Sequence, residues 1–257
     1  MLTDAHAHLN DAAYENDLDE VYKDCIDHGV GIIVNSAWDR ESSENAMLIS
    51  EKYPEAYFTV GIHPHNVKDA TNKDLYRLIE LTKHEKCVAW GEIGLDYHFD
   101  VSQKDLQIAF FERQIDIADE LSLPLVLHIR DAYKDADEVI RNKISKMKNG
   151  VLLHCYSGSM ELARDFYNKL GFYYSFGGAI TFNKNNKKSV LEVIPKDRLL
   201  IETDCPYMTP VPLRGKRNTP AYVRYVCDRM ASDLLLASEE VEKITHDNLV
   251  RFYNIKE

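Results

Sequence analysis

Hydrophobic residues along the chain form short runs that alternate with longer segments of helical spacing. The runs are apolar throughout, which indicates strands buried on both faces, as in a parallel sheet that helices cover on either side. Eight runs have the length of strands: Leu2 to Ala5, Val30 to Asn35, Tyr57 to Ile62, Cys87 to Ile93, Pro124 to Ile129, Val151 to His154, Phe172 to Phe176 and Leu199 to Glu202.

Between these runs, hydrophobic residues recur every three or four positions, a spacing that is typical of amphipathic helices. From Leu18 to Ile26 they occupy one helical face, and Gly29 follows as a residue that can end the helix. Further helices are expected over Ser42 to Lys52, Lys73 to His84, Ser102 to Ser122, Ala132 to Met147, Ser159 to Leu170, Pro220 to Leu236 and Ser238 to Tyr253.

The alternation of strand and helix predicts a (β/α)8 TIM barrel. An open, doubly wound sheet is the alternative that the pattern alone leaves. The chain has 257 residues, and neither a linker nor a shift in composition divides it. We therefore expect one domain over residues 1–257, because a barrel of this kind commonly uses such a length.

Composition excludes several classes of protein. Hydrophobic residues make up 45% of the chain and charged residues 28%, which rules out a disordered, collagen-like or coiled-coil chain. No apolar run approaches the roughly 20 residues of a membrane span, and the N-terminus does not resemble a secretory signal, so we expect a cytoplasmic protein. The five cysteines are scattered, which argues against disulfides and a cysteine-rich zinc site.

Residues of the types that bind metals stand at the carboxyl ends of the predicted strands. In a barrel those ends converge on one face, where the active sites of this fold lie. The residues are His6 and His8 after the first run, His63 and His65 after the third, Glu92 in the fourth, His128 in the fifth, His154 in the sixth and Asp204 after the eighth.

These residues predict a centre with two ions. His6 and His8 are two positions apart, so on an extended strand their side chains point the same way and can bind one ion together. Taken alone, such a motif is more often a surface pair than a metal site. Glu92 would end a buried strand at a cost of several kcal/mol unless it is paired or metal-bound, and for Asp204 the alternative is a salt bridge or a helix cap.

The imidazoles of His6, His8, His128 and His154 and the carboxylates of Glu92 and Asp204 make six candidate ligands. This number exceeds the three or four protein ligands of one catalytic zinc, which implies two ions with Glu92 as the candidate bridge. Nitrogen-rich ligation favours zinc, manganese, iron or nickel over magnesium. Cys155 and Cys205 adjoin candidate ligands, but neighbours on a strand face opposite sides, so we expect both to pack rather than bind metal.

At this point the chain resembles the TatD-type metal-dependent DNases, which belong to the amidohydrolase-like TIM-barrel hydrolases. The resemblance covers essentially the whole chain, and its motifs are specific together although His-x-His alone is not. They are Asp4-Ala5-His6-Ala7-His8-Leu9, Gly61-Ile62-His63-Pro64, Gly91-Glu92-Ile93-Gly94-Leu95-Asp96-Tyr97, Leu127-His128-Ile129-Arg130-Asp131-Ala132, His154-Cys155-Tyr156-Ser157-Gly158-Ser159, Glu202-Thr203-Asp204-Cys205-Pro206-Tyr207 and Arg214-Gly215-Lys216-Arg217-Asn218-Thr219-Pro220.

The resemblance implies roles for individual residues. Two divalent ions (Mg, Mn or Zn) are expected. The first is bound by His6, His8, Glu92 and Asp204, and the second by Glu92, His128 and His154. His63 is placed near the substrate phosphate, and Asp204 also accepts a proton, so the catalytic residues are Asp204, Glu92 and His63. For His63 the alternative is a structural histidine in a turn beside Pro64.

Basic and aromatic residues on the same face are candidates for contact with a nucleic acid. Arg214, Lys216 and Arg217 form a basic loop after the last strand, for which a solvated loop is the alternative. Similar candidates are Lys184, Lys187 and Lys188 after the seventh strand, and Phe182, Tyr156 and Tyr207 for stacking on bases. For these aromatic residues, packing is an equal alternative.

The function implied is a deoxyribonuclease that cleaves phosphodiester bonds through a water activated by two metal ions, with 3′ to 5′ exonuclease action on single-stranded DNA favoured. The alternative is hydrolysis of amide or ester bonds on the same barrel, as in an aminoacyl-tRNA deacylase, because fold alone does not separate these reactions. A binding module without catalysis would predict missing ligands, and none is missing. The oligomeric state stays open, and a monomer is plausible.

Overall fold

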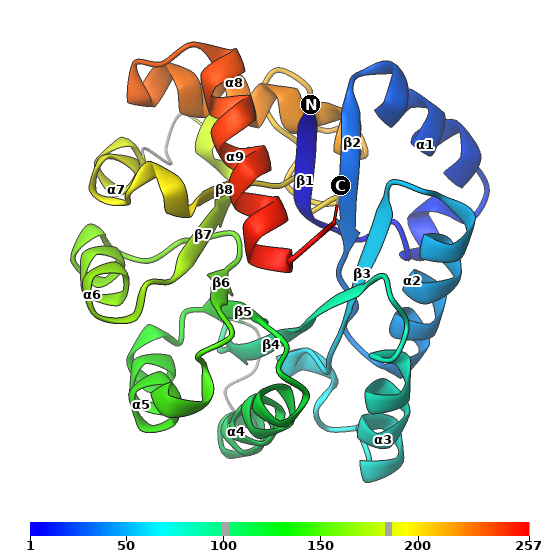
Figure 1. Ribbon diagram of the computed structural model, residues 1–257, viewed down its shortest axis with the longest axis vertical. Coiled ribbons are helices and arrows are strands. Elements are labelled where there is room, and N and C mark those ends of the chain that lie inside the picture. The colour runs from blue at the N-terminus through cyan, green and yellow to red at the C-terminus, as the bar shows by residue number, and fades with distance from the viewer. Residues whose placement is uncertain (99–102, 183–186, 257) are drawn as a thin grey trace.

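The computed structural model describes residues 1–98, 103–182 and 187–256, and across them eight parallel strands form one sheet in the order β1 to β8. Helices surround this sheet on the outside (Figure 1). The predicted TIM barrel is confirmed. The strands are β1 (Leu2–Ala7), β2 (Val30–Asn35), β3 (Ala56–Val60), β4 (Cys87–Asp96), β5 (Leu125–Arg130), β6 (Val151–Leu153), β7 (Tyr173–Phe176) and β8 (Leu199–Ile201).

The α-helices in the described residues include one that the hydrophobic pattern did not predict. They are α1 (Leu18–Asp27), α2 (Arg40–Lys52), α3 (Asn72–Leu81), α4 (Lys104–Leu121), α5 (Tyr133–Lys143), α6 (Met160–Leu170), α7 (Lys188–Val193), α8 (Val223–Leu234) and α9 (Ser238–Tyr253). The unpredicted helix is α7, whose six residues are too few to show a helical period. Ser102, the predicted start of α4, and Lys184 lie outside the described residues.

The barrel closes where the chain beyond β8 meets β1. Asp204 N–H donates to His6 O at 3.0 Å, and His8 N–H donates to Cys205 O at 2.9 Å. The buried carboxylate of Asp4 accepts hydrogen bonds from the backbone N–H and the hydroxyl of Thr203. These contacts join residues about 200 positions apart and place the ends of β1 and β8 side by side.

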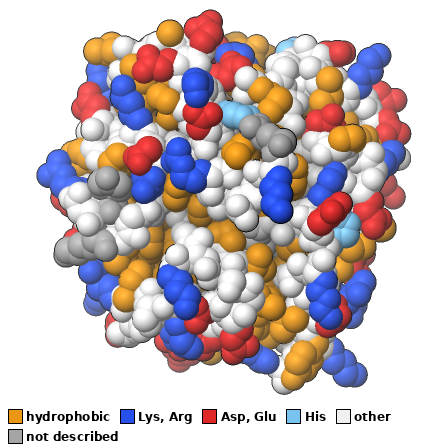
Figure 2. Space-filling view, in the orientation of Figure 1, with side chains coloured by type: hydrophobic (Ala, Val, Ile, Leu, Met, Phe, Trp, Pro, Cys, Tyr) orange, Lys and Arg blue, Asp and Glu red, His pale blue; other side chains and the backbone are white. Residues whose placement is uncertain are grey.

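Helix α9 covers the amino-terminal end of the barrel. It lies in front of the strands in Figure 1, and the hydroxyl of Tyr253 at its end donates to Ala5 O at 2.9 Å. Phe252, Tyr253 and Ile255 pack with apolar side chains of the strands. Lysine, arginine and acidic side chains are interspersed over this closed end (Figure 2). Among the described helices, none combines the length and the apolar character that crossing a membrane requires.

Two buried glutamines of α4 hold the backbone where β3 and β4 end. Gln107 accepts from Asp96 N–H at 2.9 Å and donates to Asp96 O at 3.0 Å. Gln114 accepts from Ile62 N–H at 2.8 Å and donates to Ile62 O at 3.0 Å. The two glutamines are seven positions apart, so one helical face fixes the strand ends that precede His63 and contain Asp96.

Glycines let β4 approach β5 closely beside Glu92. A Cβ atom on Gly91 would lie 2.6 Å from the Cβ and the carbonyl oxygen of Val126. At Gly94, whose φ is +142°, a Cβ would lie 2.0 Å from His128 O. The pairing of β4 with β5 shifts register between Trp90 and Ile93. A larger residue at either glycine would push apart the strands that carry Glu92 and His128.

We expect Gln114→Ala to lower the free energy of unfolding by about 2–4 kcal/mol. The change leaves both backbone groups of Ile62 and the indole N–H of Trp90, which also donates to Gln114, without their partner, and it opens a cavity. Denaturant unfolding at fixed metal concentration measures the effect. Glu120→Ala on the exposed side of α4 is the control and should shift stability by less than about 0.5 kcal/mol. A loss that small for Gln114→Ala would contradict the assigned role.

Candidate metal centre

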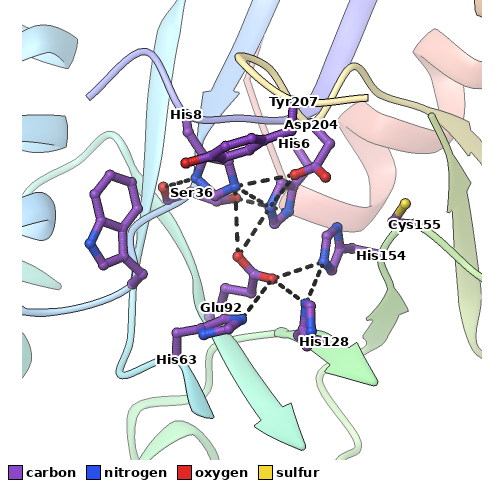
Figure 3. A network of polar contacts seen from close by, with 12 residues as sticks. His6, His8, Ser36, His63, Glu92, His128, His154, Cys155, Asp204 and Tyr207 are labelled. Carbon is purple, nitrogen blue, oxygen red and sulfur yellow. Dashed lines mark hydrogen bonds and ion pairs between the residues drawn. The ribbon is translucent and has the colours of Figure 1, made fainter. Parts of the chain in front are cut away.

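The structure brings the predicted ligand residues together at the carboxyl end of the barrel (Figure 3). They come from strands or the residues that follow them, so the parallel direction of the strands delivers all of them to one place. The residues are His6 from β1, His8 directly after it, His63 after β3, Glu92 from β4, His128 from β5, His154 after β6 and Asp204 after β8.

One group of ligand atoms lies around Oε2 of Glu92. The Nε2 atoms of His6 and His8 are 3.2 Å apart, and His6 Nε2 is 3.3 Å from Glu92 Oε2. Asp204 Oδ1 lies 3.3 Å from His8 Nε2 and 3.9 Å from His6 Nε2. These are the four residues that the sequence resemblance assigned to the first ion.

A second group lies around the other oxygen of Glu92. Glu92 Oε1 is 2.7 Å from His128 Nδ1 and 2.8 Å from His154 Nε2, and those two nitrogens are 3.2 Å apart. These three residues match the set assigned to the second ion. The Glu92 carboxylate therefore stands between the two groups and presents one oxygen to each, which is the arrangement of a bridging ligand.

Ser36 determines which ring nitrogen of His8 carries the proton, and the other nitrogen is left able to bind a cation. The Nδ1 atom of His8 lies 2.9 Å from the carbonyl oxygen of Ser36, which can only accept a hydrogen bond. A neutral His8 therefore carries its proton on Nδ1 and directs the lone pair of Nε2 at the Nε2 atom of His6. The Nδ1 atom of His6 lies 3.0 Å from the Ser36 hydroxyl, so His6 can adopt the same tautomer. A divalent ion suits two such lone pairs, and the residues present fit one.

The Glu92 carboxylate is charged despite its burial. Only 4% of the residue is exposed, and burial alone would raise its pKa. The charge of the nearby His154 imidazole and the hydrogen bond with His128 outweigh burial and hold the pKa of Glu92 well below its ordinary value. The site is therefore built around a permanent negative charge that positive groups must neutralise.

His63 is neutral and presents a hydrogen-bond donor beside the second ligand group. Burial lowers the pKa of His63 well below its ordinary value. Its Nδ1 atom accepts the backbone N–H of His65 at 3.2 Å, so its proton must lie on Nε2. That nitrogen is 3.6 Å from Glu92 Oε1, at the edge of the second ligand group.

Asp204, in the first ligand group, has a left-handed backbone conformation. Its φ is +56°, which is uncommon for a residue other than glycine and is typical of functional sites. Burial alone would raise the pKa of its carboxyl, but the hydrogen bond with His8 and the charge of His154 outweigh burial and lower that pKa. Asp204 is therefore ionised and can accept a proton.

Several polar residues of the site were not assigned a role from the sequence. Ser36 anchors the rings of His6 and His8, and Asp96 lies 2.9 Å from His128 Nε2. The criterion that identified the ligands, a polar residue at the carboxyl end of a strand, applies to both. Ser36 comes directly after β2, and Asp96 is the last residue of β4. Glu202, after β8, accepts from Cys155 N–H at 2.6 Å and lies 3.5 Å from His154 Nδ1.

Two cavities open beside the ligand groups. We call the larger, of about 550 Å³, the metal cleft; its lining includes His8, Trp38, His63, Glu92, Asp96, His128, Arg130, His154, Asp204, Tyr207 and Met208. We call the smaller, of about 360 Å³, the side cavity; its lining includes His128, Arg130, His154, Cys155, Tyr156, Phe176, Ala179, Ile180, Lys187, Asp204 and Met208. The two cavities meet at the candidate ligands, and both volumes are within the range of small-ligand pockets.

The basic loop after β8 lies apart from these cavities. Within the described residues, neither lining includes Arg214, Lys216 or Arg217. The guanidinium of Arg217 forms an ion pair with Asp17 and lies over the ring of Tyr14. The guanidinium of Arg214 lies 4.0 Å from the centre of the Phe182 ring. Among the described residues, the lysines and arginines that line the cavities are instead Arg130, which lines both, and the half-buried Lys187.

The two cysteines beside the ligands differ in exposure. Cys205 is fully buried and packs in the core, while Cys155 lines the side cavity. Among the described residues, the groups whose atoms could hold a metal consist of histidines and carboxylates and contain neither cysteine.

Comparisons with known proteins place the chain in a family. A model of the TatD related DNase family matches residues 3–254. The metal-dependent hydrolase YabD of Bacillus subtilis is 44% identical over 99% of this chain and 100% of its own length. The metal-dependent hydrolase YcfH of Escherichia coli K12 is 36% identical over 99% of this chain and 96% of its own.

Solved structures agree with these sequence matches. The crystal structure of YJJV, a TatD homologue from Escherichia coli K12, superimposes with a TM-score of 0.92 at 25% identity and covers 99% of this chain and 98% of that chain. A TatD family hydrolase from Entamoeba histolytica shares the fold with a TM-score of 0.88 at 23% identity, over 98% of this chain and 97% of that one. The chain belongs to the TatD family of metal-dependent hydrolases.

Proposed function

We propose that the protein is a deoxyribonuclease that hydrolyses phosphodiester bonds of single-stranded DNA, releasing nucleotides from the 3′ end. The observation that carries the proposal is the position of Glu92, whose two oxygens face two separate groups of ligand atoms. A pair of cations bridged by a carboxylate is the arrangement that stabilises both the attacking and the leaving oxygen in phosphoryl displacement.

Divalent ions in these positions would supply Lewis-acid chemistry, which neutralises developing charge on phosphate oxygens and makes water more acidic. The chain's own groups do the rest. Asp204, ionised and beside the first ligand group, accepts the proton of the attacking water. His63, with its proton on Nε2, donates a hydrogen bond to a phosphate oxygen or to the leaving group. Glu92 keeps the two ligand groups at a fixed separation.

The cavities fit a single strand better than a duplex. The side cavity can hold one nucleotide unit, which must leave a base stack to enter it. Trp38 and Tyr207 line the metal cleft near His8, with ring centres 5.5 and 6.4 Å from the His8 ring, and offer surfaces on which bases can stack. Arg130, shared by both cavities, can contact the phosphate between two successive nucleotides.

A longer strand would continue past the cavities. The exposed Arg214 and Lys216 lie in the loop after β8 and are proposed to contact phosphates farther from the cut. Arg217 is also part of this proposal, although its charge is already paired with Asp17. The name of the matching family, TatD related DNase, supports DNA as the substrate.

We expect Asp204→Asn to keep the fold and to lower turnover by at least about 100-fold, because the amide cannot accept the proton. The measurement is mononucleotide release from 3′-labelled single-stranded DNA with Mg²⁺ or Mn²⁺. Asp27→Asn, an exposed change on α1, is the control and should leave the rate unchanged. Full activity of Asp204→Asn would remove Asp204 from the mechanism. If the folded, metal-loaded wild type releases no nucleotide, the nuclease is refuted. The next measurement is then release of the amino acid from aminoacyl-tRNA.

We expect removal of metal to abolish activity and to lower the melting temperature of the protein. Ions that bind only the folded state stabilise it by about 2.7 kcal/mol at 100 times their Kd, so melting curves with and without Mn²⁺ measure the loss. The metal concentration needed for half-maximal stabilisation should rise as the pH falls, because protons compete for the ligand imidazoles. This competition should begin above the ordinary histidine pKa of about 6.5, since the charge of Glu92 outweighs burial and raises the pKa of His154. Melting that is the same with chelator and with Mn²⁺ at every pH would argue against the centre.

We expect Arg130→Gln to weaken binding of single-stranded DNA about tenfold, which corresponds to ~1.4 kcal/mol, through loss of a phosphate contact. The slope of log K against log salt should fall by about one. Titration in the inactive Asp204→Asn background measures both. Arg217→Gln is the comparison and should have a smaller effect because Asp17 already neutralises its charge. Equal losses of DNA affinity in the two variants would contradict the proposed contact between Arg130 and a phosphate beside the metal centre.

A further inference from the structure

Asp96 lies behind the second ligand group, and its role there is unassigned. It is the last residue of β4 and is 1% exposed. Its Oδ2 atom is 2.9 Å from His128 Nε2 and 3.0 Å from His65 Nε2, while its Oδ1 atom accepts the backbone N–H of His98 at 2.9 Å. Gln107 binds both backbone groups of Asp96. The carboxylate is therefore fixed in place from its backbone outwards.

We propose that Asp96, supported by His65, is a positioning residue that sets the proton and the ring orientation of His128, and so strengthens divalent-ion binding at the Glu92, His128 and His154 position. The inference rests on the metal centre of the proposed function. A neutral imidazole offers one lone pair, and a metal requires it on the nitrogen that faces Glu92, which is Nδ1. The proton of His128 must then lie on Nε2, where the Asp96 carboxylate accepts it.

His65 links Asp96 to the rest of the site. It belongs to the short 3-10 helix Pro64–Asn66, and its side chain is 43% exposed. Its backbone N–H fixes His63 Nδ1, and its ring nitrogen Nε2 reaches the same Asp96 oxygen as His128. A carboxylate oxygen has two lone pairs, so it can accept from both imidazoles. One exposed residue thus orients two imidazoles of the site, one directly and one through Asp96.

The two ligand groups are supported by different chemistry. The rings of His6 and His8 rest on the neutral hydroxyl and carbonyl of Ser36, whereas the ring of His128 rests on a carboxylate. A carboxylate behind a ligating histidine increases its basicity and typically contributes 10–100-fold to metal affinity. Loss of Asp96 should therefore weaken one ion position and leave the other nearly unchanged.

A direct role of Asp96 as a ligand is the competing explanation. Ligand atoms of His63, His65 and Asp96 all lie within 4.8 Å of one another, which is compact enough for an ion of their own. The separations of 2.9 and 3.0 Å between Asp96 Oδ2 and the two imidazole nitrogens are ordinary hydrogen-bond lengths, and both nitrogens share one oxygen. This geometry favours positioning, and the number of bound ions separates the two explanations.

The test is equilibrium dialysis of the full chain against Mn²⁺, with the bound metal measured by elemental analysis and no nucleic acid present. We expect two ions in the wild type. Asp96→Asn should weaken one binding step 10–100-fold and leave the other within about twofold. Either orientation of the new amide turns an NH2 group towards a donor, namely His98 N–H or the two imidazoles, so asparagine cannot replace the carboxylate.

Two further variants keep the test decisive. His65→Ala, a partly exposed change, should weaken the same step by a smaller factor, and it replaces Asp96→Asn as the test if that variant does not fold by circular dichroism. Asp69→Asn, an exposed carboxylate change outside the ligand groups, is the control and should bind metal as the wild type does.

Three outcomes would overturn the proposal. The first is wild-type metal binding in both Asp96→Asn and His65→Ala. The second is three ions in the wild type with one lost in each variant, which would make these residues ligands. The third is fewer than two ions in the wild type. Because dialysis needs no substrate, failure to cut DNA refutes the nuclease without affecting this result.

Discussion

A negative charge buried inside the barrel is the constraint on which the rest of the site depends. Glu92 is 4% exposed and remains ionised, which only positive charge close to both of its oxygens can compensate. The barrel meets this requirement by placing imidazole nitrogens 2.7 to 3.3 Å from the carboxylate on two sides. These nitrogens come from β1, β5 and the end of β6, so the charge is balanced only when the barrel is closed.

Backbone groups near the strand ends are held by side chains, and this gives the site its precision. Asp4 joins the ends of β1 and β8 through Thr203, and Gln107 and Gln114 fix the ends of β4 and β3 from the helix outside. Ser36 uses its hydroxyl and its carbonyl to orient two imidazoles at once. Each of these polar groups is buried, so the hydrogen bonds that position the ligands also satisfy the backbone.

Positive side chains stand beside the metal centre although the chain as a whole is acidic, and this contrast affects which substrates can bind there. The chain has a net charge of −11, yet Arg130 and Lys187 stand beside the cavities that meet at the ligands. An acidic surface disfavours indiscriminate binding of nucleic acid, whereas a local positive group beside the centre favours one phosphate in one place. This combination supports the proposed nuclease over a protein that coats DNA.

The sequence by itself determined the architecture and the identity of the candidate ligands. Apolar runs of strand length alternate with helical segments, and parallel strands bring their carboxyl ends to one face, so His6, His8, Glu92, His128, His154 and Asp204 could be grouped without coordinates. The spacing of hydrophobic residues did not predict helix α7, because six residues are too few to show a helical period.

Only the tertiary structure decided which atoms face each other. The tautomer of His8 depends on a carbonyl 28 residues away, the proton of His128 on a carboxylate 32 residues away, and the pairing of Arg217 with Asp17 spans 200 residues. Sequence spacing carries no information about such contacts, because they arise from the packing of strands and loops that are distant along the chain. Residue types at strand ends are fixed by the sequence, whereas their hydrogen-bond partners exist only once the barrel has closed.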